Sequence, residues 1–431
     1  MKWLIVFVVS FFSLTCNNGT EPVTSTVQFT AANVGVTDAL LHVTFDQFIP
    51  SNVVTLRKNG STILTVTISG FDTLLSVDSL LPKHNYTFGL SVNSSLSLSL
   101  KPSTLNITTM DTTSNNFTWQ IDTLGDGNSS ILNDVAIIND TLIYVVGEVN
   151  IKDSLGNWMT TPYNLAQWDG ITWKLKTVLY PYQGLTSYSK LYSIFFFGVN
   201  DYWVGSNQPM HWNGIKWETF DLPASIWTGW IYKMWGTSSH DLYIVGQNGS
   251  IAHYDGMSWQ KMESRTSLNI ADILGAANTA TGKSEILAVA GNYIETYDRQ
   301  ILSISPSGVK ILSDSGISYG LNGIWFSSSR YYWVTGAGIW EKHPTLSASF
   351  WQQVPASTFA TNAVRGNEVN DVFLCGAYGE LIHFNGVSWK SFRSQTGLSA
   401  GQYVSIATKG NMVCAVGELA ARAVVLIGKR N

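Results

Sequence analysis

The sequence predicts an all-β protein of more than one domain. Charged residues make up only 13% of the 431 residues, while aromatic residues reach 13%. Low charge combined with many β-branched and aromatic residues favours strands over helices. A chain of this length exceeds one ordinary hydrophobic core. The formal charge of −4 and the pI near 6.0 provide no basic field, so we expect no nucleic-acid partner.

Residues 1–15 are predicted to be a signal peptide. Lys2 supplies a small positive region, and the apolar run LIVFVVSFFSL covers residues 4–14. This run is shorter than the roughly 20 residues that a membrane-spanning helix needs. We therefore expect an exported protein.

Cys16 follows this apolar run directly, and residues 16–25 form a polar tether. The placement resembles the lipobox of bacterial lipoproteins, in which the cysteine is lipidated and becomes the first mature residue. The family prefers Leu three positions before the cysteine and Gly or Ala just before it, whereas this chain has Ser13 and Thr15 at those positions and its leucine, Leu14, is moved by one. The resemblance implies an anchor through an N-terminal lipid only. The alternative is an ordinary cleaved signal peptide.

Residues 26–110 are predicted to form a small β-sandwich from short strand-like runs. The stretch LLPKHNYTF at 80–88 resembles the tyrosine corner of fibronectin type III domains, L-x-P-x-x-x-Y-x-F. The core Trp that is usual in that family is missing, and Phe45 is its expected replacement. The resemblance implies a spacer module, and another immunoglobulin-like sandwich would carry the same meaning.

The region 116–431 carries an internal repeat. A strand-like run that ends in glycine recurs with steps of 58, 41, 45, 45, 40 and 41 residues, and another apolar run precedes each copy. The glycines are Gly147, Gly205, Gly246, Gly291, Gly336, Gly376 and Gly417. A period of about 40–45 residues with four short strands is typical of a β-propeller blade, so seven copies predict seven blades.

Outer hairpins follow most of these runs. They read QWDGITW, HWNGIKW, HYDGMSW and HFNGVSW, and we expect the Asp-Gly or Asn-Gly pair to supply the positive backbone angles of a two-residue turn. The units resemble the W-G-S-S…D-V-W-A-V-G…H-Y-D-G-x-x-W repeats of many exported bacterial proteins. Blade 4 departs from this pattern, because Tyr297-Asp298-Arg299 replaces the turn and Val309 stands near the expected tryptophan. Blade 5 is partial and closes with Trp351.

The stretch NNFTWQID at 115–122 resembles the last strand of a blade with no blade before it. The final repeat has only three strands before Asn431. We therefore expect this stretch to supply the outer strand of the seventh blade and to close the ring.

The residues point to no catalytic constellation, cofactor or metal. His211, His253 and His383 recur at one repeat position, which favours a structural role. Asp201, Asp241 and Asp371 also recur, and we expect them to cap turns. Cys375 and Cys414 lie in apolar runs and are expected to be buried free thiols.

A candidate binding surface lies in the long loops of the first blades, EVNIKDSLGNWMTTPY at 148–163, VLYPYQGLTSYSK and DLPASIWTGWIY. They contain the aromatic residues Trp158, Tyr180, Tyr182, Tyr188, Trp227 and Trp230. Gathered on one face, these side chains would suit sugar stacking or the apolar anchor of a protein partner. The alternative is that they fold over and seal the blades.

The sequence thus predicts an exported, lipid-anchored, monomeric protein of the bacterial cell envelope. Its propeller would act as a binding or scaffold module for a glycan or protein ligand and not as an enzyme. The alternative is a carbohydrate-active enzyme with two carboxylates about 5–10 Å apart at the mouth of the propeller.

Overall fold

A computed structural model describes residues 25–93, 98–182, 185–277, 284–292, 298–328, 330–343 and 350–431, without the side chains of residues 49, 50, 181 and 182. The predicted signal peptide, Cys16 and most of the tether lie outside the described residues. Contacts divide the described chain into two compact units. One comprises residues 25–33, Leu40–Leu75 and Asn85–Thr108, and the other comprises Val34–Ala39, Ser76–His84 and Thr109–Asn431.

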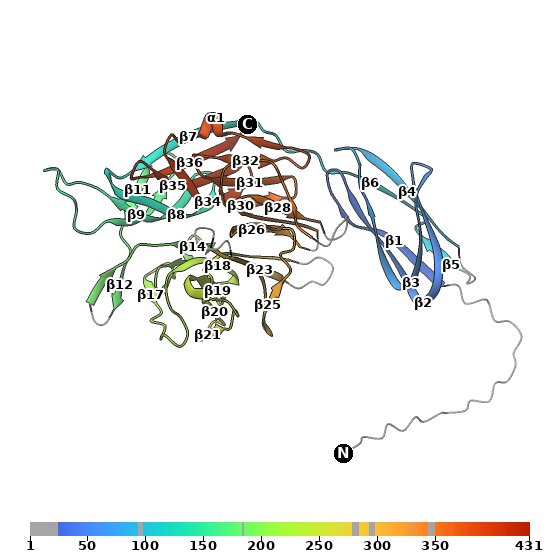
Figure 1. Cartoon of the computed structure of the whole chain (residues 1–431), viewed down its shortest axis with the longest axis horizontal. Helices are drawn as coiled ribbons and strands as arrows, with labels where there is room; N and C mark the ends of the chain where they lie inside the picture. Colours follow the sequence, from blue (N-terminus) through green and yellow to red (C-terminus); the bar gives the residue numbers. More distant parts are fainter. Residues whose placement is uncertain are drawn as a thin grey trace, which may run out of the picture. The chain divides into compact units, whose positions relative to one another are not determined.

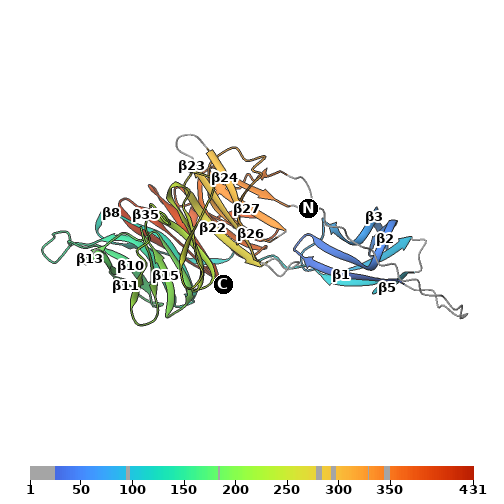
Figure 2. The same ribbon diagram turned by 90° about the horizontal axis from the view of Figure 1, so that it is seen from below.

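The described residues of the N-terminal unit form six strands whose ladders connect into one sheet (blue in Figure 1). The strands are β1 (Ser25–Val34), β2 (Ala39–Lys58), β3 (Ser61–Val77), β4 (Asn85–Asn93), β5 (Leu98–Lys101) and β6 (Thr104–Thr108). Their order is β5-β1-β2-β4-β6, and β3 also pairs with β2. The pair β1–β5 is parallel, and Figure 2 shows these two strands side by side.

The second unit is a seven-bladed β-propeller, as predicted. Its described residues form seven four-stranded antiparallel sheets, numbered here as blades 1–7. Blade 1 consists of β8 (Gly127–Asn139), β9 (Leu142–Asn150), β10 (Tyr163–Trp168) and β11 (Trp173–Lys176). Blade 2 consists of β14 (Ser193–Gly198), β15 (Asp201–Gly205), β16 (Pro209–Trp212) and β17 (Trp217–Thr219). Blade 3 consists of β18 (Ile231–Ser238), β19 (Asp241–Gly246), β20 (Ile251–Tyr254) and β21 (Trp259–Met262).

Blades 4–6 follow the same order. Blade 4 consists of β22 (Ile270–Ala277), β23 (Ser284–Asn292), β24 (Asp298–Ser305) and β25 (Gly308–Leu312). Blade 5 consists of β26 (Leu321–Ser327), β27 (Tyr331–Gly336), β28 (Ile339–Lys342) and β29 (Gln352–Gln353). Blade 6 consists of β30 (Thr361–Glu368), β31 (Asp371–Gly376), β32 (Leu381–Phe384) and β33 (Trp389–Ser391). Blade 7 consists of β34 (Gly401–Lys409), β35 (Met412–Leu419), β36 (Arg422–Arg430) and β7 (Phe117–Leu124).

Strand β7 closes the ring. It pairs antiparallel with β36 from Phe117↔Arg430 to Leu124↔Ala423, so the first propeller strand completes the last blade. Figure 1 shows β7 beside β36. The prediction made from NNFTWQID is therefore confirmed. This ladder ties together segments roughly three hundred residues apart in the chain and covers an otherwise open edge.

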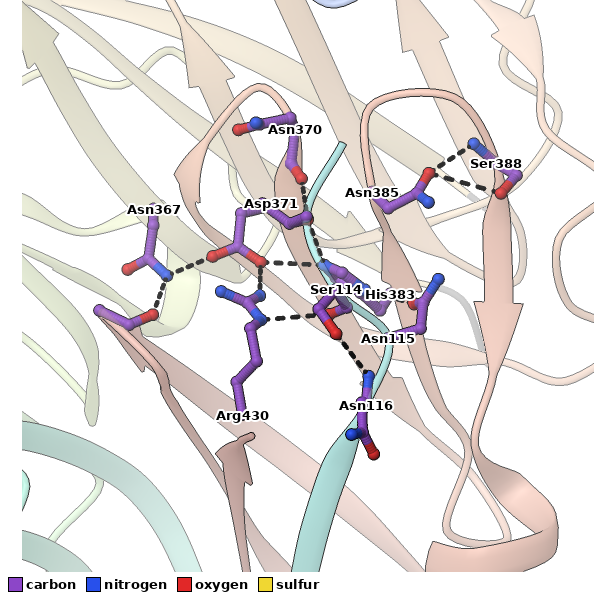
Figure 3. A network of polar contacts seen from close by, with 12 residues as sticks. Ser114, Asn115, Asn116, Asn367, Asn370, Asp371, His383, Asn385, Ser388 and Arg430 are labelled. Atoms are coloured by element: carbon purple, nitrogen blue, oxygen red, sulfur yellow. Dashed lines mark hydrogen bonds and ion pairs between the residues drawn. The ribbon is translucent and has the colours of Figure 1, made fainter. Parts of the chain in front are cut away.

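A polar network reinforces the closure (Figure 3). Arg430 of β36 pairs with Asp371 of β31, and its Nε donates to the carbonyl of Ser114 at 3.1 Å. The buried His383 ring lies 2.9 Å from Asp371 Oδ1 and, through Nδ1, 2.7 Å from Asn115 Oδ1. Blades 6 and 7 and the segment before β7 are thus joined by side chains as well as by the ladder.

The propeller core lies between the blades. Each gap between successive blades holds one hydrophobic cluster of buried side chains, including the gap between blades 7 and 1. The outer-strand tryptophan of a blade packs toward the blade before it. Trp259 of blade 3, for example, lies 5.8 Å from the ring of Trp203 in blade 2. Trp351 of blade 5 donates its indole N–H to the carbonyl of Ser313, just after blade 4.

The outer hairpin turns differ from the predicted two-residue type. In blade 1, Trp168 pairs with Trp173, so four residues form the loop, and only Gly170 has a positive φ, of 94°. Asp169 instead accepts hydrogen bonds from the backbone N–H groups of Ile171 and Thr172. Asn213, Asp255 and Asn385 repeat this arrangement. The acid or amide caps the turn, and the glycine alone supplies the left-handed backbone.

Besides the blades, the described part of the propeller contains one hairpin and two short helices. The hairpin β12 (Leu179–Tyr182) and β13 (Leu185–Tyr188) lies between blades 1 and 2 and extends at the left of Figure 1. Among the described residues of the propeller, two segments form short helices, η1 (Gln247–Gly249) and α1 (Arg393–Thr396). In the part of the chain that is described, neither helix is long and apolar enough to cross a membrane.

Candidate functional site

Two of the predicted binding aromatics are buried between blades. Tyr180 is 5% exposed and packs in the gap between blades 1 and 2, and Trp227 is 4% exposed in the gap between blades 2 and 3. The indole N–H of Trp227 donates to the carbonyl of Gly229 at 2.9 Å. Both rings therefore seal the blades, which corrects the expectation that they form a binding surface.

The other predicted residues have different surroundings. Trp158 lies in the loop between β9 and β10, is 41% exposed, and has the ammonium of Lys152 5.0 Å from its ring centroid. The side chain of Tyr182 lies outside the described residues. Tyr188 and Trp230 are half-buried at the blade ends where the inner strands begin. Of the five predicted residues whose side chains are described, two are therefore buried and three keep exposed surface.

Tyr188 and Trp230 instead belong to a group that we call the rim cluster, together with Glu148, Tyr192 and Tyr232. The ring of Tyr192 lies 5.0 Å from that of Trp230 and 6.2 Å from that of Tyr232. The hydroxyl of Tyr188 donates to Glu148 Oε2 at 3.0 Å. All five side chains are half-buried, so each keeps part of its surface open to a ligand.

Burial and charge keep the rim phenols protonated. Burial, together with the adjacent Glu148 carboxylate, raises the pKa of Tyr188 well above its ordinary value. Burial also raises the pKa of Tyr192, with smaller contributions from Tyr232 and Glu148. The ammonium of Lys190 lies 5.7 Å from the centroid of the Tyr192 ring. The cluster thus combines aromatic faces, neutral hydroxyl donors and a carboxylate acceptor, and the Lys190 cation lies beside it.

The backbone explains why Tyr232 points to the rim. The ladder between β18 and β19 shifts register between Ile231 and Lys233, which leaves Tyr232 as the extra residue of a β-bulge. Bulges redirect side chains and are common next to functional sites. Tyr192 has the same place in blade 2, one residue before Ser193 begins to pair. An alignment of the runs LYSIFFF and IYKMWG places Tyr192 and Tyr232 at the same repeat position and could have identified both as candidate site residues. The prediction missed them because it considered only the composition of the loops.

The central channel is lined by all seven inner strands and encloses about 280 Å³. Two ion pairs cross it between blades that are not neighbours. Lys233 of blade 3 pairs with Asp134 of blade 1, and Arg365 of blade 6 binds Asp272 of blade 4 with two hydrogen bonds of 2.8 and 2.7 Å. Ser405 of blade 7 donates to Asp134 at 2.7 Å. Burial opposes the charge of Arg365, but Asp272 outweighs it and raises the pKa of the guanidinium.

Neither channel carboxylate is free for chemistry. Asp134 also accepts the backbone N–H of Ile194 at 3.1 Å, and Asp272 accepts that of Ile324 at 3.0 Å. A glycosidase needs one carboxyl group that holds a proton and another that attacks or activates water. These two are each neutralised by a cation and saturated with donors, so they hold the blades together instead. Among the described residues, no group of His, Cys, Asp and Glu side chains is placed to hold a metal ion.

The recurrent histidines pair with the recurrent aspartates. His211 lies 2.7 Å from Asp201, His253 2.7 Å from Asp241, and His383 2.9 Å from Asp371. Each imidazole also stacks on an aromatic ring of the neighbouring strand, namely Trp203, Tyr243 or Phe373. The aspartates thus orient the histidine rings, and the expected structural role of the histidines fits this geometry.

The two inner cysteines are buried free thiols, as expected. Burial raises the pKa of Cys375 to about 12 and that of Cys414 still further. Both therefore stay as unreactive thiols that pack between the blades.

Comparisons with known proteins show which fold this chain shares. No family model matches this chain, and no curated protein matches its sequence. A solved structure of YCF48 bound to a D1 peptide is similar with a TM-score of 0.54 and 16% identity, covering 73% of this chain and 97% of the other. YCF48 from Cyanidioschyzon merolae is similar with a TM-score of 0.51 and 13% identity, covering 72% and 98%. The fold is that of a β-propeller.

Proposed function

We propose that this protein is a binding module whose propeller takes a segment of a protein partner at the rim cluster. The observation that carries the proposal is the combination of half-buried Tyr188, Tyr192, Trp230 and Tyr232 with the Glu148 carboxylate. Tyrosine and tryptophan dominate the binding energy of protein interfaces, because they bury a large rigid surface and keep a polar tip.

The geometry favours a peptide over a sugar. The rings of Tyr192, Trp230 and Tyr232 are packed against one another, with centroids 5.0 and 6.2 Å apart, so they cover part of each other's surface, whereas sugar stacking needs one open face. The hydroxyl groups and Glu148 can bond to backbone amides or to a cationic side chain. Among structures of similar fold, that of YCF48 is of a complex with a D1 peptide. This supports a peptide ligand by analogy of fold only.

Selection of a displayed peptide library against the full mature chain would test the proposal. For selected peptides, we expect Tyr192→Ala and Trp230→Ala to weaken binding about tenfold or more by isothermal titration calorimetry. The matched control is Tyr319→Ala, which removes an aromatic side chain that is 40% exposed away from the rim cluster.

Two results would contradict the proposal. One is that selected peptides bind both rim variants as tightly as the unchanged protein. The other is that a glycan array, run in parallel, yields ligands whose binding depends on Tyr192 or Trp230 while no peptide is selected.

We further propose that the chain is exported to a bacterial cell envelope and held there by a lipid on Cys16. The apolar run before Cys16 and the polar tether after it support this assignment. Mass spectrometry of the mature N-terminus decides the matter. A diacylglycerol-modified Cys16 is expected, and an unmodified Cys16 or cleavage at another position would contradict it.

The N-terminal unit is proposed to be a fibronectin type III-like spacer. In support, residues 53–58 of β2 pair with β4, and β4 pairs with β6, as strands in one sheet of such a domain do. Tyr86 and Phe88 of the expected tyrosine corner are buried, and so is Phe45, the expected replacement for the core Trp. An experimental structure with a single open sheet in place of a sandwich would overturn this assignment.

A further inference from the structure

The gap between blades 3 and 4 differs from the other interblade gaps. In the regular gaps, an outer-strand tryptophan packs toward the blade before it. Trp173 of blade 1, for example, donates its indole N–H to Asp122 of blade 7 at 2.9 Å. Blade 4 has Val309 at this position, where it is buried against Trp235 and Tyr243. Valine lacks most of the volume of an indole, so the outer part of this gap is left unfilled.

A groove of about 650 Å³ lies between the outer hairpins of blades 3 and 4. We call it the interblade groove. Val309, Tyr243 and Met262 give it an apolar floor, and the His253 ring, stacked on Tyr243 at 4.1 Å, forms part of its wall. The inner part of the gap is filled by Trp235, whose ring covers Gly275 of blade 4. The space is therefore confined to the outer rim, where a partner can reach it.

The charges around the groove favour an acidic ligand. Arg265 and Lys310 line it, are exposed, and form no ion pair within the described part of the chain. Lys261 and Glu263 neutralise each other at 2.8 Å. Asp255 accepts the N–H groups of its own turn, and these hydrogen bonds hold the pKa of its carboxyl below the ordinary value. Two cations thus remain available for carboxylates of a partner.

We propose that the interblade groove is a second docking site, which takes an aromatic side chain flanked by acidic residues in a peptide segment of a partner protein. The aromatic ring would occupy the space that an outer-strand tryptophan fills in the regular gaps, and the flanking carboxylates would pair with Arg265 and Lys310. Burying such a ring in an apolar pocket ringed by charges is the usual arrangement of an interface anchor. This site is separate from the rim cluster and does not depend on it.

Fluorescence polarisation with the full chain tests the proposal. The probe is a short labelled peptide with one Trp between Asp and Glu residues. Its controls carry Ala in place of Trp, or Lys in place of the acids. We expect the acidic Trp peptide to bind at least about tenfold more tightly than either control, because each control removes one half of the recognition.

Protein variants locate the site. Val309→Trp fills the groove from within and should reduce binding at least about tenfold, while the double variant Arg265→Glu with Lys310→Glu should do so without touching the core. The matched controls are Lys409→Glu, an exposed cation on blade 7, and Trp230→Ala in the rim cluster, and both should leave binding unchanged.

Four outcomes would overturn the proposal. The acidic Trp peptide could bind no better than its Ala control. Binding could survive Val309→Trp in a protein that melts normally, or, if that variant does not fold, survive the double charge variant. Loss of binding in Trp230→Ala but not in the groove variants would assign the peptide to the rim cluster. Self-association that Val309→Trp abolishes would show that a second copy of this chain occupies the groove.

Discussion

The gap between blades 6 and 7 and the gap between blades 3 and 4 are built from the same repeat but are filled differently. In the first, Trp119 of β7 packs 5.0 Å from the ring of the buried Phe392 and covers Gly428, where a Cβ atom would lie 2.2 Å from the indole. In the second, Val309 stands in the place of that tryptophan, and a groove of about 650 Å³ remains.

The histidines of the two gaps also differ in burial, and again the closure is the more tightly packed of the two. His383 at the closure is fully buried and bonded to Asp371 and Asn115, whereas the side chain of His253, at the same repeat position, is 25% exposed and lines the groove. The closure is held by a filled gap, a ladder and a polar network. The groove has only its inner half packed. One repeat position therefore serves stability in one blade and leaves a surface for recognition in another.

Removing the closing strand should have the largest effect. Deletion of residues 115–124 removes β7, the outer partner strand of β36, and opens blade 7, so we expect loss of the cooperative propeller transition in differential scanning calorimetry. The control is deletion of 153–157, exposed residues in the loop between β9 and β10, which should shift the transition only slightly. A cooperative transition that persists near its normal temperature without 115–124 would show that the ring does not need its closing strand.

Removing one partner of a channel ion pair tests whether interactions outside the interblade gaps also stabilise the closed propeller. Arg365→Met leaves Asp272 buried without its cation, which should cost about 3–5 kcal/mol in urea-induced unfolding. Adding Asp272→Leu removes the stranded charge and should recover much of the loss. If Arg365→Met costs less than about 1 kcal/mol, the pair contributes as little as an exposed ion pair does.

Converting the filled gap into the open type is the direct test of the comparison. Trp119→Val places at the closure the residue that blade 4 carries, and the cavity beside Phe392 should cost about 2–4 kcal/mol of unfolding free energy. Thr118→Val, on the same strand but with an exposed side chain, is the control. Equal stability of the two variants would mean that the indole contributes nothing to the closure.

The reverse change should have a smaller effect of opposite sign. Val309→Trp fills the groove and is expected to raise the free energy of unfolding by about 0.5–2 kcal/mol, as cavity-filling substitutions do. Val309→Ala enlarges the same space and should destabilise the propeller. Destabilisation by both substitutions would indicate that the groove cannot accept an indole from within.

The buried histidine of the closure should make the stability of the propeller depend on pH. Burial, helped by Arg430 and Lys390 and opposed by Asp371, lowers the pKa of His383 below its ordinary value. The unfolded chain therefore takes up this proton first, and stability is lost as the pH falls below about 6.5, by at most about 1.4 kcal/mol per pH unit. His383→Gln should flatten this acid limb, measured by urea unfolding between about pH 6.5 and 5. An unchanged slope in His383→Gln would contradict the assignment.

The sequence by itself determined the repeat. Glycine spacing, Asp-Gly turns and the recurring tryptophans depend on contacts within one blade or between neighbours, which a local pattern records. For the same reason the closing strand could be predicted, and so could Val309 near the tryptophan position of blade 4, since each is a departure from a period. The turn of blade 4 was placed wrongly, because Asp298 and Arg299 lie in β24 and the outer turn follows Ser305. The turn type was predicted wrongly because Asp169 and its counterparts cap a four-residue loop, which the dipeptide alone does not distinguish from a tight turn.

Only the tertiary structure decided which polar and aromatic side chains meet. Glu148 of blade 1 meets Tyr188 of the hairpin after that blade, and Arg365 reaches Asp272 across the channel, although neither pair follows the repeat. Tyr180 and Trp227 look like Tyr188 and Trp230 in the sequence, yet the first two are buried and the second two reach the rim. The physical reason is that burial and pairing depend on how seven sheets face one another around the ring, and no single segment encodes that arrangement.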